Sequence, residues 1–164
     1  MESEFGMLEF YDGEYASLLK DKNFKLAYGT AGFWTKEHLL DRVCFRTGII
    51  ASLIALKSKR SGIMITASHN PIEDNGVKIV NFNGSVLNKY WEATSEKFIN
   101  TPNLIKDFKD LLEENEISLE NPTESVVIIG YDTWPSSIWL AACVSWAVEY
   151  LGLKQKNFGE VTTG

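Results

Sequence analysis

The sequence contains few of the residues that mark several classes of protein. Two cysteines, Cys44 and Cys143, occur among 164 residues, in separate apolar segments and without a CxxC spacing. Such usage excludes a disulfide framework and a cysteine zinc site, so both are expected to be buried free thiols. No Asp-x-Asp-x-Asp run is present either. The chain therefore offers no carboxylate cluster of the kind that usually holds magnesium.

Long apolar runs are also absent. The longest, residues 138–148, is shorter than the roughly 18 to 20 residues that a membrane-spanning helix needs. The first fifteen residues, MESEFGMLEFYDGEY, are acidic and lack the basic and apolar regions of a secretory signal. We therefore expect a cytoplasmic protein with no membrane partner.

Positive charge is scarce as well. The net charge is -6 and the isoelectric point is near 5.0, which disfavours binding to a nucleic-acid backbone. The one basic cluster, residues 57–60, is short and suits the last turn of a helix. Nucleic acid is therefore not an expected partner.

A large share of the chain is suited to a folded core, because 45% of its residues are hydrophobic and its length is that of one domain. The spacing of apolar residues predicts helices at 39–56, 88–98, 104–116 and 136–151. Short apolar runs predict strands at 63–66, 77–80, 126–130 and 158–161. Pro135 is expected in the first turn of the last helix, and Gly152 at its end. This alternation predicts a three-layer α/β domain.

Two loops contain the residues that are candidates for ligand binding or catalysis. In YGTAGF, residues 28–33, the glycines allow the backbone to approach an anion or another chain segment, although a plain turn is the simpler interpretation. In TASHNPIEDNG, residues 66–76, Ser68 and His69 are adjacent, so their side chains point apart and do not form a hydrolase pair. This loop is either a hydrogen-bonded turn or a ligand site at a strand's carboxyl end, with Lys78 adding positive charge.

The second loop, with its Lys78, resembles the phosphoserine loop of the α-D-phosphohexomutases. YGTAGF and GYDTWPSS, residues 130–137, match further motifs of this superfamily in the same order, and the similarity covers nearly the whole chain. The motifs YGTAGF and EDNGVK are most similar to those of the phosphoacetylglucosamine mutase family. The resemblance implies an α/β fold, namely a three-layer α/β/α domain with a mixed central sheet.

The resemblance also implies a chemistry. Ser68 would carry a phosphoryl group, donate it to one hydroxyl of a hexosamine phosphate and recover it from another, interconverting N-acetylglucosamine 6-phosphate and 1-phosphate. His69 and Lys78 would assist as proton-transfer or phosphoryl-stabilising groups, and which of them is the base stays open. One Mg²⁺ would bind through the phosphorylated Ser68. The other residues implied in the phosphoryl and substrate loops are Thr30, Gly32, Asn70 and Asn75.

The sequence departs from the family pattern at three positions and in length. Trp34, Tyr131 and Trp134 stand where the family has arginines, so three positive charges are lost. Family members have four domains, and residues 1–164 are expected to be the N-terminal one, without the metal-, sugar- and phosphate-binding domains. On its own such a fragment would be inactive. The alternative is a non-catalytic module that binds a sugar phosphate or a partner, for which exposed side chains at Trp134 and Trp139 would argue.

Overall fold

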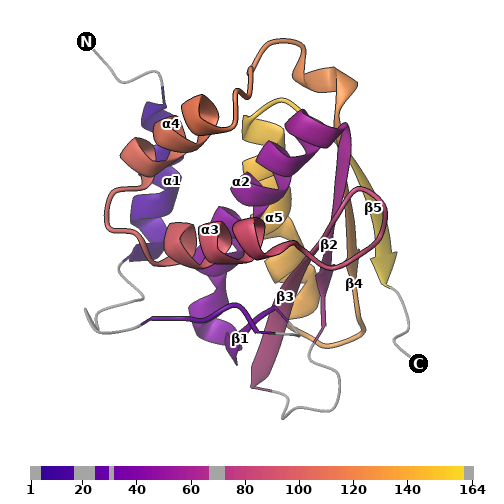
Figure 1. The fold of residues 1–164 in the computed structure, drawn as a ribbon. Coiled ribbons are helices and arrows are strands. Elements are labelled where there is room, and N and C mark those ends of the chain that lie inside the picture. The colour runs from indigo at the N-terminus through magenta and orange to yellow at the C-terminus, as the bar shows by residue number, and fades with distance from the viewer. Residues whose placement is uncertain (1–4, 17–24, 30–31, 67–72, 161–164) are drawn as a thin grey trace.

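A computed structural model describes residues 5–16, 25–29, 32–66 and 73–160. Its five-stranded sheet has the order β1-β3-β2-β4-β5 (Figure 1). β2, β4 and β5 are parallel, whereas β3 runs antiparallel to β1 and β2. The strands are β1 (Phe33–Lys36), β2 (Arg60–Ile65), β3 (Asp74–Val80), β4 (Val126–Tyr131) and β5 (Lys154–Glu160). The predicted α/β class and mixed sheet are therefore confirmed.

Five α-helices and two short 3-10 helices accompany this sheet in the described residues. The α-helices are α1 (Gly6–Ala16), α2 (Leu40–Ser58), α3 (Lys89–Asn100), α4 (Leu104–Glu114) and α5 (Ser137–Tyr150). The 3-10 helices are η1 (Glu37–Leu39) and η2 (Pro122–Glu124). None of the described helices is long and apolar enough to cross a membrane.

The helices form two layers on one face of the sheet. α2 and α5 pack on the strands, and α1, α3 and α4 lie on the far side of α2 (Figure 1). The second helical layer thus covers the first one, so among the described helices none covers the other face of the sheet. Inward residues of β2 such as Ile63 and Ile65 are fully buried, while the alternating Gly62 and Met64 are partly accessible.

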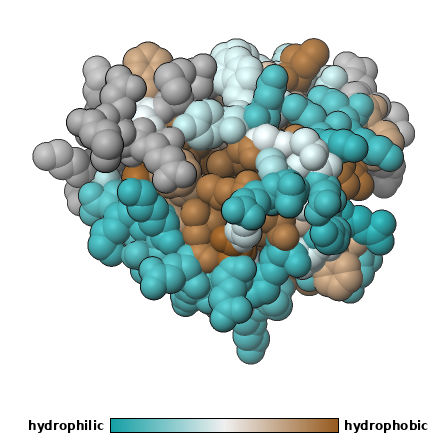
Figure 2. Space-filling model, turned by 90° about the horizontal axis from the view of Figure 1, so that it is seen from above, coloured by the Kyte–Doolittle hydropathy of each residue, from teal (hydrophilic) through white to brown (hydrophobic). Residues whose placement is uncertain are grey.

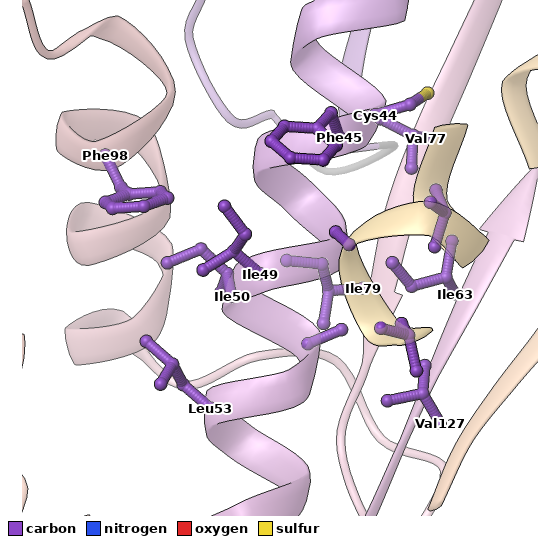
Figure 3. Close-up of a cluster of buried hydrophobic side chains, with 14 of the residues drawn as sticks. Cys44, Phe45, Ile49, Ile50, Leu53, Ile63, Val77, Ile79, Phe98 and Val127 are labelled. Carbon is purple, nitrogen blue, oxygen red and sulfur yellow. The ribbon is translucent and has the colours of Figure 1, made fainter. Parts of the chain in front are cut away.

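The core centres on α2, whose apolar residues face both the sheet and the outer helices. In Figure 3, Ile49, Ile50 and Leu53 lie between Phe98 of α3 on one side and strand residues such as Ile79 on the other. α2 and α5 approach closely at Gly48, where a Cβ atom would lie 2.7 Å from the carbonyl oxygen of Val144. A layered core of this kind fixes the ends of the strands, and these ends position the loops.

The predicted elements correspond to the observed ones, with several differences. Strands β2 and β3 each begin three residues earlier than predicted, at Arg60 and Asp74, so Asn75 and Gly76 lie within β3 rather than in the loop before it. Helix α1 and strand β1 were not predicted. The last strand begins four residues earlier than expected, at Lys154. Pro135 precedes the N-cap residue Ser136 rather than occupying the first helical turn. Gly152 follows α5 with φ of +85°, as expected of a helix-ending glycine.

The two ends of the sheet differ in what they expose. Figure 2, which views the molecule from above, shows hydrophobic side chains at the bottom of a hollow with a largely hydrophilic rim. The ends of α2 and α4 and the loop after α4 lie on this side (Figure 1), and four apolar residues there are only partly buried: Leu56, Leu112, Ile117 and Leu119. The carboxyl end of β2 lies on the opposite side, and the serine loop begins there.

Candidate functional site

The carboxyl ends of β2 and β4 and the start of β3 meet at one edge of the sheet. The amide of Asp132, just after β4, donates to the carbonyl oxygen of Ile65 at 3.0 Å, and the amide of Thr66 donates to the carbonyl oxygen of Gly76 at 3.1 Å. These bonds hold both ends of the loop that carries the predicted serine. Ser68, His69 and Asn70 themselves lie outside the described residues, as does Thr30 of the other loop.

Asn75 links the start of β3 to the turn before α5. Its side chain is fully buried, and its amide nitrogen donates to Ser136 Oγ at 2.8 Å and to Ser137 Oγ at 3.0 Å. Ser137 Oγ in turn donates to Asp132 Oδ1 at 2.6 Å, and this oxygen also accepts from the Trp134 amide at 3.1 Å. The network connects two motifs that lie about sixty residues apart. Asn75 is therefore placed to fix loop geometry.

The YGTAGF segment lies against β3. Gly29 and Gly32 exchange backbone hydrogen bonds of 3.1 and 3.0 Å, which closes a tight turn. Gly32 has φ of +86°, and a Cβ atom there would collide with the Val77 carbonyl and lie 2.9 Å from Lys78 Cα. The close approach that its glycine permits is thus to another segment of the chain. Tyr28 is anchored beside it, because its hydroxyl accepts from the Ile79 amide at 3.1 Å, and burial raises the pKa of this phenol.

An ion-pair cluster borders the serine loop. Lys36 Nζ lies 2.9 Å from Asp74 Oδ1 and 3.7 Å from Glu73 Oε1, and the Glu37 amide donates to the Glu73 carbonyl oxygen at 2.7 Å. The hydrogen bond to Asp74 raises the pKa of the Lys36 ammonium group. Sequence reasoning missed this cluster. The charges of Glu73 and Asp74 in the loop were visible, but their partner lies on a strand that was not predicted.

Lys78 lies on the face of the sheet away from α2 and α5. Its neighbours Val77 and Ile79 are fully buried against the helices, while Lys78 is partly accessible and pairs with Met64 of β2. Its pair with Met64 is thus next to the last pair of β2, Ile65 with Val77, after which the serine loop starts. This position puts a cation near that edge of the sheet.

The three aromatic residues predicted to stand at arginine positions of the family differ in exposure. Trp34 on β1 is 44% exposed, and its ring packs beside Gly76. Tyr131 packs partly buried against the core, and Trp134 is half-buried in the turn before α5. Trp139 is exposed on α5. The exposure expected of a partner-binding surface is thus found at Trp139 but only partly at Trp134.

The described residues do not form a metal site by themselves. No group of three or more histidine, cysteine, aspartate or glutamate side chains in them is arranged to hold a metal ion. Both cysteines are buried and form no disulfide, as predicted, and burial raises the pKa of Cys44 well above its usual value. Cys44 is therefore not available as a thiolate ligand or nucleophile.

Comparison with known families gives a match in the part of the chain that contains this edge of the sheet. Residues 35–104 match the model for "Phosphoglucomutase/phosphomannomutase, alpha/beta/alpha domain I". Phosphoacetylglucosamine mutase 1 of Schizosaccharomyces pombe is 40% identical over 146 residues, which are 87% of this chain and 27% of that protein. The human phosphoacetylglucosamine mutase is 37% identical over 163 residues, 98% of this chain and 29% of that protein.

Solved structures of such mutases have a similar fold over nearly the whole of this chain. An Aspergillus fumigatus N-acetylphosphoglucosamine mutase superposes with a TM-score of 0.85 at 33% identity, over 99% of this chain and 30% of that one. An N-acetylglucosamine-phosphate mutase in its substrate complex gives 0.83 at 36% identity, over 95% and 30% of the two chains. The resemblance predicted from the sequence is confirmed. The chain spans less than a third of the length of these relatives.

Proposed function

We propose that this chain, which is similar to domain I of the phosphoglucomutases and phosphomannomutases and to the phosphoacetylglucosamine mutases, is the phosphoserine-bearing domain of such a mutase. The reaction is the interconversion of N-acetylglucosamine 6-phosphate and 1-phosphate, a step toward UDP-N-acetylglucosamine. One observation carries the proposal: Thr66 and Gly76, which flank the segment with Ser68, are joined by a hydrogen bond at the carboxyl end of β2. Open α/β sheets bind their ligands at such edges.

In the proposed reaction Ser68 is the phosphoryl carrier. A sugar hydroxyl oxygen bonds to the phosphorus as the bond to Ser68 Oγ breaks, and the hydroxyl proton passes to a base. The resulting bisphosphate reorients, and Ser68 recovers the phosphoryl group from the other sugar oxygen. His69 and Lys78 are the candidates for the base and for the stabilising cation, since charge on the phosphoryl oxygens must be offset in a loose transition state.

The loop residues divide into two proposed roles. Thr30 and Asn70 are proposed to contact the phosphoryl group or the substrate. Gly32 and Asn75 support these loops instead, because Gly32 packs on β3 and Asn75 donates to Ser136 and Ser137. This division follows from contacts that are already occupied within the fold.

Magnesium is proposed to bind through the phosphorylated Ser68. A related mutase of Aspergillus fumigatus has been solved in complex with GlcNAc-6P and magnesium. The described residues supply no further set of metal ligands, so its other ligands would come from elsewhere. Bound there, the ion would offset negative charge on the phosphoryl group.

A second candidate function is a non-catalytic module that binds a sugar phosphate or a partner. Two observations favour it: Trp34 stands 44% exposed where the family has an arginine, and Trp139 is 46% exposed on α5. An indole cannot make the bidentate contacts that an arginine makes with a phosphoryl group. The two candidates differ in whether Ser68 supports turnover.

A chimeric enzyme distinguishes them. Residues 1–164 would replace the matching segment of the Saccharomyces cerevisiae phosphoacetylglucosamine mutase, which is 39% identical over 140 residues. We expect turnover in a coupled assay, its loss in Ser68→Ala, and full retention in the control Ser85→Ala, which alters an exposed serine in another loop. Residues 1–164 alone should show none, because positioning by the other domains supplies much of the rate.

The same chimera tests the lost arginine. Trp34→Arg should raise turnover on the order of a hundredfold, by analogy with restoring one donor to an oxyanion, and Trp134→Arg should raise it much less. Turnover that survives Ser68→Ala would contradict the mutase proposal. A folded chimera that stays inactive even with Trp34→Arg would favour the non-catalytic module.

A further inference from the structure

Helix α5 presents an apolar stripe to solvent. Its large members, Ile138, Trp139 and Trp146, are 64%, 46% and 38% exposed, and its small members are Ala142 and Ser145. These five residues, which we call the tryptophan stripe, recur at steps of three and four and therefore lie on one side of the helix. Large exposed apolar side chains that gather in one patch mark interaction surfaces, whereas single scattered ones do not.

The stripe points away from the elements on which α5 packs. These are α2, β4 and β5, while α1, α3 and α4 lie on the far side of α2 (Figure 1). Trp139 Nε1 donates to Asp41 Oδ2 on α2 at 3.3 Å, and its ring meets that of Trp146 edge to face, with centroids 5.3 Å apart. These contacts fix the two indoles within the chain itself, which lowers the entropic cost of binding a partner.

Charge limits the kinds of partner that suit this surface. Glu149 is the one charged residue in the sequence of α5, SIWLAACVSWAVEY, and the carboxylate of Asp41 at the border already accepts from Trp139. The stripe thus offers little to a strongly charged partner helix. A nucleic acid or an anionic membrane would be repelled by the net charge of -6. An apolar surface fits, and a second copy of this chain carries one.

We propose that the tryptophan stripe is a homodimer interface, in which two α5 helices pack antiparallel about a twofold axis near Ala142. In such an interface every contact occurs twice, once in each direction. Ile138 and Trp146 are each four residues from Ala142, so Trp146 would pack on the partner's Ile138. Trp139 and Ser145 are each three residues from it, so a large side chain would face a small one. The stripe is therefore complementary to itself.

The ends of α5 are complementary in the same arrangement. Glu149 lies in the last turn of α5, where its carboxylate faces the negative end of the dipole of its own helix. In the antiparallel pair it would lie level with the partner's Pro135, just before the amino end of that helix, where a carboxylate is stabilising. The first turn of α5 contains no acidic residue that would oppose this contact. None of these residues belongs to the candidate site, so the dimer does not depend on the proposed catalytic function.

The size of the stripe sets the expected strength. A tryptophan side chain presents on the order of 250 Å², so the exposed parts of the two indoles offer roughly 200 Å² per copy. A stable complex buries about 800 Å² per partner, so the stripe predicts a weak dimer with a Kd of roughly 10 to 100 µM. Added salt should strengthen this dimer, because it screens the repulsion between two acidic molecules and leaves the apolar contacts intact.

Sedimentation equilibrium tests the proposal, both with residues 1–164 and with the yeast chimera, at roughly 5 to 500 µM protein. We expect both to form dimers, with a lower Kd at about 0.5 M than at about 0.1 M sodium chloride. Trp146→Ser should weaken association about tenfold or more in each, as the loss of a central aromatic anchor does. The matched control Trp34→Ser removes an indole of similar exposure, 44% against 38%, from β1 and should leave the Kd within about twofold.

A cysteine near the twofold axis tests the geometry. The axes of closely packed helices lie about 8 to 10 Å apart, which brings the two Cα atoms at a crossing within reach of a disulfide. Ala142→Cys should therefore link two copies when oxidised glutathione is added, whereas Ser85→Cys, in an exposed loop, should not. Cys44 and Cys143 are buried and form no disulfide, so they should add no background.

Several results would overturn the proposal. These are monomers at the highest concentration, an equal loss in Trp34→Ser, or equal linking of Ser85→Cys. A dimer of residues 1–164 that is absent from the folded chimera would show that other domains of a mutase cover the stripe. Monomers that bind phosphatidylcholine vesicles through Trp146 would assign the stripe to a lipid surface instead. Circular dichroism of each variant separates loss of association from loss of folding.

Discussion

At the scale of single residues, a buried arginine joins the two helical layers. Arg46 on α2 is 1% exposed and makes a bidentate pair with Asp12 of α1, with both nitrogen–oxygen distances at 2.8 Å. Its Nη1 group donates to three backbone carbonyl oxygens at and just after the end of α3, those of Phe98, Ile99 and Thr101. Arg42 lies near the same carboxylate, and burial lowers its pKa. Asp12 therefore balances buried positive charge.

Removing this carboxylate tests its importance. Asp12→Ala should lower the free energy of unfolding by about 3 to 5 kcal/mol, since it leaves a buried guanidinium unpaired. The control Asp110→Ala breaks the exposed pair with Lys106 on α4 and should cost less than about 1 kcal/mol. Urea unfolding followed by circular dichroism measures both. Similar losses in the two variants would show that Arg46 does not depend on Asp12.

The sequence pointed to the serine loop but not to this arginine or to the partners of Asn75. Arg46 occurs within an apolar helical segment, and a charge at such a position is a signal of a buried pair. The identity of its partner depends on where α1 packs. Asn75 likewise meets Ser136 and Ser137 only because β3 and the turn before α5 are neighbours in space. Such partners require knowledge of the tertiary arrangement.

At the scale of elements, the strands and helices that were predicted are those with a strong apolar period. β1 has only four residues, FWTK, and lies at the edge of the sheet, so little burial pattern is visible in it. α1 is held by contacts of Phe5, Leu8 and Asp12 rather than by a regular stripe. The early residues of β5 are polar because an edge strand is accessible. Tertiary contacts, not local propensity, define these three elements.

The contact of YGTAGF with β3 gives a prediction at this scale. Gly32→Ala should lower the free energy of unfolding by roughly 3 kcal/mol or more, because backbone strain adds to a collision with the backbone of β3. Gly84 has nearly the same φ, +85° against +86°, but open space around it, so Gly84→Ala should cost only about 1 kcal/mol. Thermal and urea unfolding give the loss of stability in each variant, and the difference between them is the cost of the collision beyond that of the backbone strain. Equal costs would mean that β1 can shift away from β3 freely.

At the scale of the whole molecule, the helical layers and the strand ends have separate roles in this account. α2 and α5 pack on one face of the sheet, and α1, α3 and α4 lie on the far side of α2 (Figure 1). This packing fixes the ends of β2, β3 and β4, between which the serine loop begins and ends. The class of fold and the strands that flank the serine loop were predictable from the sequence, because their apolar runs are strong. The position of the second helical layer was not, because it depends on tertiary contacts such as that of Arg46 with Asp12.

The central claim is that Ser68 carries the phosphoryl group, and peptide mass spectrometry tests it most directly. The chimera would be incubated with glucose 1,6-bisphosphate, a sugar bisphosphate with which a related mutase has been crystallised, and then digested. A phosphoserine adds about −1.5 to −2 charges at pH 7, so the modified form is also separable by ion exchange. The account predicts one phosphate on the peptide that contains Ser68, present in Ser85→Ala and absent in Ser68→Ala. Phosphate on another residue, with Ser68 unmodified, would contradict it.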